Sequence, residues 1–260
     1  MKKLSVIIWT ALLVLGCFIS SYAAAIGPVR PLGDKKFSIG YENDYVFSRT
    51  IKAKVDINGG KIKDAQRNFL LLGLGLSEHF NLYARLGGGN FREQLKWSGG
   101  SEQTIKYGYG FIWGVGGNVS YKFKNNFGIG FDAQFNLASN KNKSINGSAN
   151  PFFIPGGKVM VKTYEIQLTP YVSYDAEINQ NCKIMPYLGG CYSYYNVYKG
   201  ISFADGTGGG YFTEDEKIRG ENHLGLLGGV EVLLYKQWSL KLEGRFITET
   251  ALSSAVSYKF

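Results

Sequence analysis

Two histidines are the first residues in this sequence whose chemistry could be catalytic. His79 and His223 are the only histidines among the 260 residues, and a histidine beside a carboxylate or hydroxyl can act as a general acid or base. His223 falls near the outer end of a predicted strand, where it could meet Asp44, Glu221 or Ser48. A single histidine beside acids is more often a hydrogen-bonded structural group. We therefore predict no enzyme and keep a hydrolase centred on His223 as the less favoured reading.

The sequence has no motif for a bound cofactor. It contains no zinc-type histidine pair, no Walker phosphate loop and no strand-to-helix GxGxxG motif. We expect no catalytic residue, no cofactor and no metal. The formal net charge is +9, which in an exported protein favours lipid phosphates and anionic glycolipids as partners rather than nucleic acid.

Charged residues in the middle of apolar segments form a second group with possible chemistry. Lys241, Glu243 and Arg245 alternate with apolar residues, and Glu231 interrupts an apolar run. Charges on one face of a strand can pair inside a barrel or set the selectivity of a narrow pore. We predict a charge network in the lumen formed by Glu42, Asp44, Arg85, Asp132, Glu165, Glu231, Lys241, Glu243 and Arg245.

The elements that must position these residues are strands. From residue 105 to 123 the odd positions are apolar or aromatic and the even positions small or polar, and residues 127–137 repeat the rule. A period of two over this length indicates strands and not helices. Longer connections are expected at 49–67, 94–103, 140–158 and 198–220. The strands are predicted near residues 37–48, 68–76, 80–91, 104–123, 127–139, 159–174, 183–197, 221–235, 238–247 and 251–260.

Two features decide which face of these strands meets lipid. Charges stand at mid-strand on the polar face, and aromatic residues gather near strand ends on the apolar face, as in the girdles of transmembrane barrels. We therefore predict an all-β chain: a single antiparallel up-and-down transmembrane β-barrel of about ten strands, with eight possible. The girdle residues are Phe37, Phe80, Phe123, Phe127, Tyr174, Trp238 and Tyr258.

The N-terminus has the pattern of a secretory signal peptide. Lys2 and Lys3 precede an apolar stretch at 4–19 and small residues at 22–25, which predicts cleavage after Ala25 or after residue 23. We assign residues 1–25 to the signal peptide and 26–260 to one barrel domain. An uncleaved membrane anchor and a lipidated Cys17 are the alternatives.

The C-terminus carries the most specific motif. Residues 252–260, LSSAVSYKF, resemble the closing strand of bacterial outer-membrane barrels, with alternating apolar residues before a terminal aromatic. The resemblance implies that the barrel-assembly machinery recognises Val256, Tyr258 and Phe260. The chain is similar to the small outer-membrane β-barrel family that includes opacity-type proteins and the barrel domain of outer-membrane protein A. Many members have eight strands.

These patterns predict a protein of the cell outer membrane with a structural or surface-interaction role. The alternative is a narrow passive pore for small solutes or ions. Basic outer loops could contact lipopolysaccharide or another anionic partner, and a monomer is favoured. The loop residues in question are Lys52, Lys54, Lys61, Lys63, Arg67, Lys141, Lys143 and Lys158, with acidic residues at Asp205, Glu214, Asp215 and Glu216 in the fourth loop.

Overall fold

Antiparallel strands make up most of the computed structural model, which describes residues 25–53, 57–97, 100–147, 158–204, 211–220, 223–247 and 249–260. No helix in these ranges is long and apolar enough to cross a membrane. The strands are β1 (Phe37–Ala53), β2 (Ile57–Gly75), β3 (Phe80–Trp97), β4 (Glu102–Lys122), β5 (Phe127–Gly147), β6 (Lys158–Tyr174), β7 (Ala176–Asn179), β8 (Cys182–Ala204), β9 (Tyr211–Gly220), β10 (Leu224–Leu234), β11 (Trp238–Phe246) and β12 (Glu249–Lys259).

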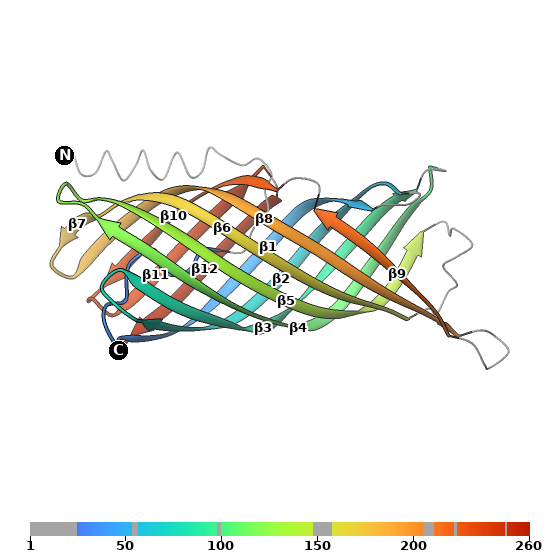
Figure 1. The fold of residues 1–260 in the computed structure, drawn as a ribbon, viewed down its shortest axis with the longest axis horizontal. Helices are drawn as coiled ribbons and strands as arrows, with labels where there is room; N and C mark the ends of the chain where they lie inside the picture. Colours follow the sequence, from blue (N-terminus) through green and yellow to red (C-terminus); the bar gives the residue numbers. More distant parts are fainter. Residues whose placement is uncertain are drawn as a thin grey trace.

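Ten of these strands close into one barrel (Figure 1). Neighbours in the chain pair with each other, β8 pairs with β10, and β12 pairs with β1 to close the ring. The two remaining strands are additions at the ends: β7 extends the β8 hairpin, and β9 lies between β8 and β1. The predicted ten-stranded up-and-down barrel is confirmed, and the alternative of eight strands is wrong.

The barrel is apolar outside and polar inside over the part nearest the short turns, which we call the inner half. Leu188 and Val172 are more than half exposed, while Glu42 and Asp132 are completely buried. At the inner end, Phe127 packs edge-on against Tyr174 with ring centroids 5.1 Å apart. This arrangement is that of a transmembrane barrel, whose exterior contacts lipid and whose interior satisfies its own polar groups.

The strands are longer than a membrane requires. β4 and β5 have 21 residues each, whereas about 9–11 tilted residues cross the hydrocarbon core. The long loops predicted at 49–67, 94–103 and 140–158 are therefore wrong over much of their length, because strand pairing continues beyond the membrane there. Part of the fourth predicted loop, 198–220, likewise belongs to the β8–β9 hairpin.

Irregular pairing marks the change from the inner half to the outer extension. The register shifts between Val46 and Ser48 in β1 and between Lys63 and Gln66 in β2, and again in β4 near Tyr107. In β1 the interior positions are even up to Val46 and odd from Arg49 onward. A bulge adds one residue to a strand, so it exchanges the faces on which odd and even residues lie.

The interior of the outer extension is filled mainly by apolar side chains, which surround a buried ion pair between Lys199 and Glu93 at 2.8 Å. Ile105, Leu95 and Val161 are completely or almost completely buried there. They belong to one cluster of twelve buried residues, packed with Phe91 and Ile145: Val46, Ile51, Ile62, Ala65, Leu95, Ile105, Tyr107, Val159, Val161, Tyr195, Val197 and Ala251.

Candidate functional site

The segment before the first strand lies inside the inner half of the barrel. Residues 25–36, which we call the plug, lead from the start of β1 into the lumen, where Ile26 and Val29 are buried. No strand or other element is predicted from the sequence between the signal peptide and residue 37. The plug donates four backbone hydrogen bonds to lumen side chains: Ile26 to Glu243 (3.2 Å), Gly27 to Asp132 (3.0 Å), Val29 to Glu231 (3.0 Å) and Leu32 to Asn81 (2.8 Å).

The carbonyl oxygens of the plug are bound as well. Arg85 donates to the carbonyl of Ala25, and Lys241 donates to that of Ile26. The Tyr171 hydroxyl donates to the carbonyl of Val29 at 3.2 Å. Backbone groups without strand partners must find other partners when buried. The lumen side chains supply them. Apolar packing with Tyr171, Met185, Tyr187, Cys191 and Leu227 completes the contact.

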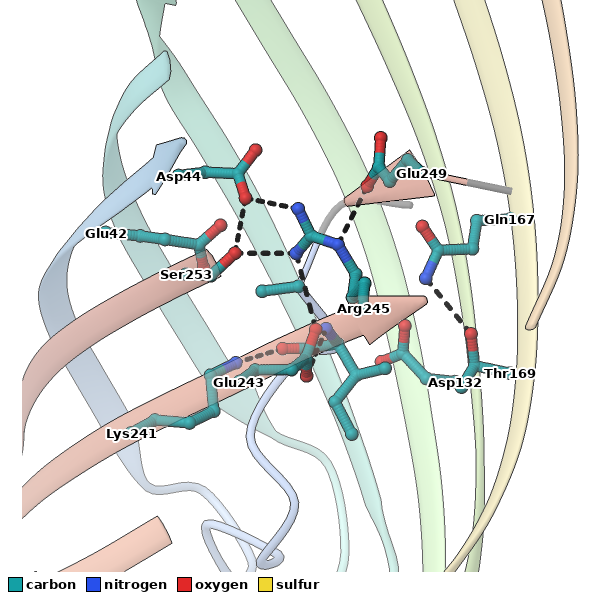
Figure 2. A network of polar contacts seen from close by, with 12 residues as sticks. Glu42, Asp44, Asp132, Gln167, Thr169, Lys241, Glu243, Arg245, Glu249 and Ser253 are labelled. Carbon is teal, nitrogen blue, oxygen red and sulfur yellow. Dashed lines mark hydrogen bonds and ion pairs between the residues drawn. The ribbon is translucent and has the colours of Figure 1, made fainter. Parts of the chain in front are cut away.

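Arg245 is the centre of the charged cluster directly beyond the plug (Figure 2). Its guanidinium donates to Asp44, to Glu249 at 2.9 Å and to the Ser253 hydroxyl at 2.6 Å. Glu243 lies 3.4 Å away. A buried guanidinium is tolerated only when several acceptors surround it. Arg245 has four, contributed by β1, β11 and β12.

The cluster continues toward the outer extension through two further arginines. Arg67 pairs with Asp44 at 2.5 Å and lies 3.7 Å from Glu165. Arg49 lies 3.6 Å from Glu165, and its guanidinium stacks 3.3 Å from the centre of the Tyr195 ring. A cavity of about 60 Å³ adjoins these arginines and is large enough to hold water.

All nine residues predicted for the lumen network are buried inside the barrel. Direct side-chain contacts connect only part of this set. Asp44, Glu243 and Arg245 meet in the Arg245 cluster, whereas Asp132, Glu231 and Lys241 bind the backbone of the plug. Arg85 pairs with Glu42 at 3.4 Å, and Glu165 is connected to the Arg245 cluster through Arg67, which also binds Asp44.

Sequence reasoning missed several members of the cluster. Arg67 was predicted in a basic outer loop, which is wrong: it points inward on the same strand face as Phe69. That shared parity was a usable signal. Arg49 follows the bulge in β1, and Glu249 lies between the strands predicted at 238–247 and 251–260. The alternation therefore carries no signal for either residue.

His223 is placed against β8. In the described ranges, its Nδ1 lies 2.9 Å from the carbonyl oxygen of Ser193, and its ring packs on Tyr192 and Tyr194 with centroids 5.7 and 5.8 Å apart. No contact to Asp44 or Ser48 is present among these interactions. Glu221 lies outside the described residues. No described group of three His, Cys, Asp or Glu residues is placed to hold a metal ion.

Other predicted residues also fall outside the described part of the chain. They are Lys54, Asp205 and most of the signal peptide, including Cys17. The side chains of Lys158, Glu214, Asp215 and Glu216 are likewise not described.

Comparison with known proteins gives a similarity of architecture. No family model and no curated protein sequence matches the chain. Solved outer-membrane barrels do. The translocator domain of autotransporter NalP from Neisseria meningitidis is 12% identical over 88% of each chain, with a TM-score of 0.45. The outer membrane protease OmpT from Escherichia coli is 11% identical over 92% of this chain and 99% of its own, with a TM-score of 0.47.

A third similar structure is the outer membrane protein OprG from Pseudomonas aeruginosa, 11% identical over 88% of this chain and 99% of its own, with a TM-score of 0.38. Identities and scores this low carry no information about activity, and no residue role is transferred from these proteins. Membership of the opacity-type family stays a prediction.

Proposed function

We propose that this protein is an integral outer-membrane β-barrel with a closed interior and a structural or surface-interaction role. The observation that carries the proposal is the filled lumen. The plug occupies the inner half, the Arg245 cluster lies beyond it, and the apolar cluster fills the outer extension. A solute would have to displace buried ion pairs to pass, and breaking such pairs is costly.

Conductance across a planar bilayer tests the closed interior. Purified protein inserted in the bilayer is expected to give no resolvable single-channel steps, since all three layers block the passage. Regular steps from the unaltered protein would overturn the proposal and favour the narrow pore.

The partner that we propose is the phosphate-rich surface of lipopolysaccharide. Four exposed lysines lie on the outward face of three neighbouring strands, beyond the apolar outer surface of the inner half. We call them the lysine rim: Lys106 on β4, Lys141 and Lys143 on β5, and Lys162 on β6. On β6 the outward positions run from Tyr174 through apolar residues to Tyr164, and Lys162 follows. This order supports a position of the ammonium groups near the lipid headgroups.

Charge reversal tests the lysine rim. The triple variant Lys141→Glu, Lys143→Glu and Lys162→Glu is expected to bind purified lipopolysaccharide at least about tenfold more weakly at low salt, because each surface lysine contributes about 1 kcal/mol. The matched control reverses Lys124 and Lys236, which are exposed in turns at the inner end. Equal binding by both variants, or binding that is independent of salt, would refute the proposal.

The C-terminal strand supports a proposed contact with the barrel-assembly machinery. Tyr258 packs edge-on against Trp238 and Phe260, with ring centroids 5.0 Å apart in both pairs, and Phe260 is exposed. Deleting Phe260 is expected to lower the amount of folded barrel in the membrane while refolding in detergent is unchanged. A monomer is proposed as the functional state.

A further inference from the structure

The backbone nitrogen of Ile26 lies deep in the lumen and faces a buried carboxylate. It is 3.2 Å from Oε2 of Glu243, and both residues are completely buried. The peptide bond that precedes this nitrogen, between Ala25 and Ile26, is one of the two bonds at which the sequence predicts removal of the signal peptide, and the one that bounds the assigned signal peptide at residues 1–25. Cleavage would therefore convert an amide N–H inside the barrel into a free amino group.

We propose that removal of the signal peptide creates an α-ammonium group at Ile26, which pairs with Glu243 in the lumen and stabilises the plug in its place. This rests on the proposed closed barrel and names the group that keeps it closed. Hydrolysis consumes one water: Ala25 leaves as the C-terminal carboxylate of the signal peptide, and the Ile26 nitrogen takes up a proton. The new group has three N–H donors and a full positive charge.

The charge balance of the lumen favours a further cation. Of the described residues, eight acidic side chains are buried and only five basic ones, with the partly buried Arg67 as a sixth positive charge. An uncompensated buried carboxylate is unfavourable, so an α-ammonium stabilises this interior. The buried acids are Glu42, Asp44, Glu93, Asp132, Glu165, Glu231, Glu243 and Glu249, and the buried bases are Arg49, Arg85, Lys199, Lys241 and Arg245.

One carboxylate oxygen of Glu243, Oε2, is placed to accept a hydrogen bond from the α-ammonium group of Ile26. Oε1 is 3.4 Å from Arg245, a distant contact, while Oε2 accepts from the Tyr187 hydroxyl at 2.8 Å and faces Ile26. Cleavage removes the Ala25 carbonyl that Arg85 binds. Arg85 then keeps Gln134 and, at 3.4 Å, Glu42.

Glu231 provides a matched control inside the same plug. Its Oε2 accepts the backbone N–H of Val29 at 3.0 Å, and this nitrogen stays a neutral amide whether or not the chain is cleaved. A hydrogen bond that involves a charged group on both sides is stronger than one to a neutral amide. The two carboxylates should therefore respond differently when the charge at the N-terminus is removed.

A double-mutant cycle measures the pair directly. The chain is prepared to begin at Ile26, and its unfolded form is either left free or acetylated at the α-amine near pH 6.5, where lysines react little. Both forms are refolded in detergent, with Glu243 or with Glu243→Gln. Acetylation is expected to lower the folding equilibrium constant of the protein with Glu243 about ten- to a hundredfold. The folding equilibrium constant of Glu243→Gln should fall much less.

Glu231→Gln serves as the control, and acetylation should cost it as much as it costs the unaltered protein. Equal losses in the Glu243 and Glu243→Gln backgrounds would overturn the pair. If Glu243→Gln does not refold, the reactivity of the α-amine in the unaltered protein decides. It should react at least about tenfold more slowly in the folded barrel than in urea, and equal rates would overturn the proposal.

N-terminal sequencing of the protein from membranes tests the cleavage step. Ile26 as the first residue supports the proposal, and any other first residue overturns it. Neither this measurement nor the cycle uses conductance. A conducting barrel would therefore count against the proposed closed interior without deciding the ion pair, and an absent ion pair would leave the closed interior standing.

Discussion

The inner half and the outer extension of this barrel fill their interiors in opposite ways. In the inner half, buried charges and the plug occupy the lumen, and the outward side chains are apolar. In the outer extension the interior is mainly an apolar cluster with a single Lys199–Glu93 ion pair among its described residues, and lysines such as Lys141 and Lys143 face outward. The same strands run through both regions, so the difference does not come from topology.

The solvent around each region explains the difference. Beyond the membrane the alternative to burial is water, and apolar side chains gain by turning inward, as in a soluble sheet. At membrane height lipid already surrounds the apolar face, so that face gains little from turning inward. Polar groups must instead be satisfied within the barrel. The bulges near Val46 and in β2 and β4 change whether odd or even positions point inward. The apolar face of a strand can therefore meet lipid in the inner half and the interior in the outer extension.

The largest expected effect comes from removing the central charge of the inner half. Arg245→Leu leaves Asp44 and Glu249 without their principal partner, and loss of one member of a buried ion cluster costs about 3–5 kcal/mol. Urea unfolding in detergent measures the loss. Arg92→Leu is the control, because its pair with Asp64 at 3.2 Å is well exposed and is worth less than about 1 kcal/mol. Similar losses in both variants would show that the buried charges of the inner half stabilise the barrel no more than an exposed ion pair does.

A smaller effect is expected from the apolar filling of the outer extension. Leu95→Ala removes a side chain that is almost completely buried in the apolar cluster, and this should lower the free energy of unfolding by about 2–4 kcal/mol. The neighbouring Lys96→Ala, which points into solvent, should change it by less than about 0.5 kcal/mol. A negligible loss for Leu95→Ala would show that the outer extension contributes no core.

The plug contributes apolar contact inside the polar half. Val29→Ala removes part of a side chain buried with Tyr171 and Leu227, and about 1.5 kcal/mol of stability should be lost. Asp34→Ala, in the exposed turn of the same segment, serves as the control. Equal stability of the two variants would mean that the plug is held by polar contacts alone.

The smallest effect is expected at the inner rim, where Asp175 lies between β6 and β7. Burial raises its pKa, but the hydrogen bond from Lys122 at 2.8 Å and the charge of Arg30 outweigh this and lower the pKa below 3.8. The stabilisation is therefore present above pH 3.8 and is lost as the pH falls through the lowered value.

Asp175→Asn should cost less than about 1 kcal/mol at pH 7, and the difference from the unaltered protein should vanish in acid. Unfolding measured between pH 7 and pH 2 tests this. A difference that stays constant over this range would contradict the ionic origin.

Part of this structure could be predicted from single residues and their spacing. The alternation at 105–123 predicted β4 and, from Tyr109 onward, its outward face, whereas Ile105 and Tyr107 point inward beyond the bulge. The mid-strand charges of β11 predicted the polar lumen. Arg67 was within reach, since it shares its parity with Phe69. Arg49 was not, because the bulge after Val46 reverses the parity before it, and a bulge has no fixed sequence signature. The plug gave only a weak signal, the apolar Ile26, Val29 and Leu32 in a segment without alternation.

The residue pattern alone predicts an antiparallel barrel of about ten strands, with an apolar exterior and a polar interior at membrane height, and leaves eight strands possible. It could do so because lipid on one side and polar groups on the other impose a period of two on every strand, which is a local property. Which charges meet, where the faces exchange and what fills the lumen depend on contacts between residues that are far apart in the chain. Asp44 and Arg245 are separated by 201 residues in the chain. Their contact depends on closure of the ring between β12 and β1, and on the plug that enters it, neither of which is set by local sequence.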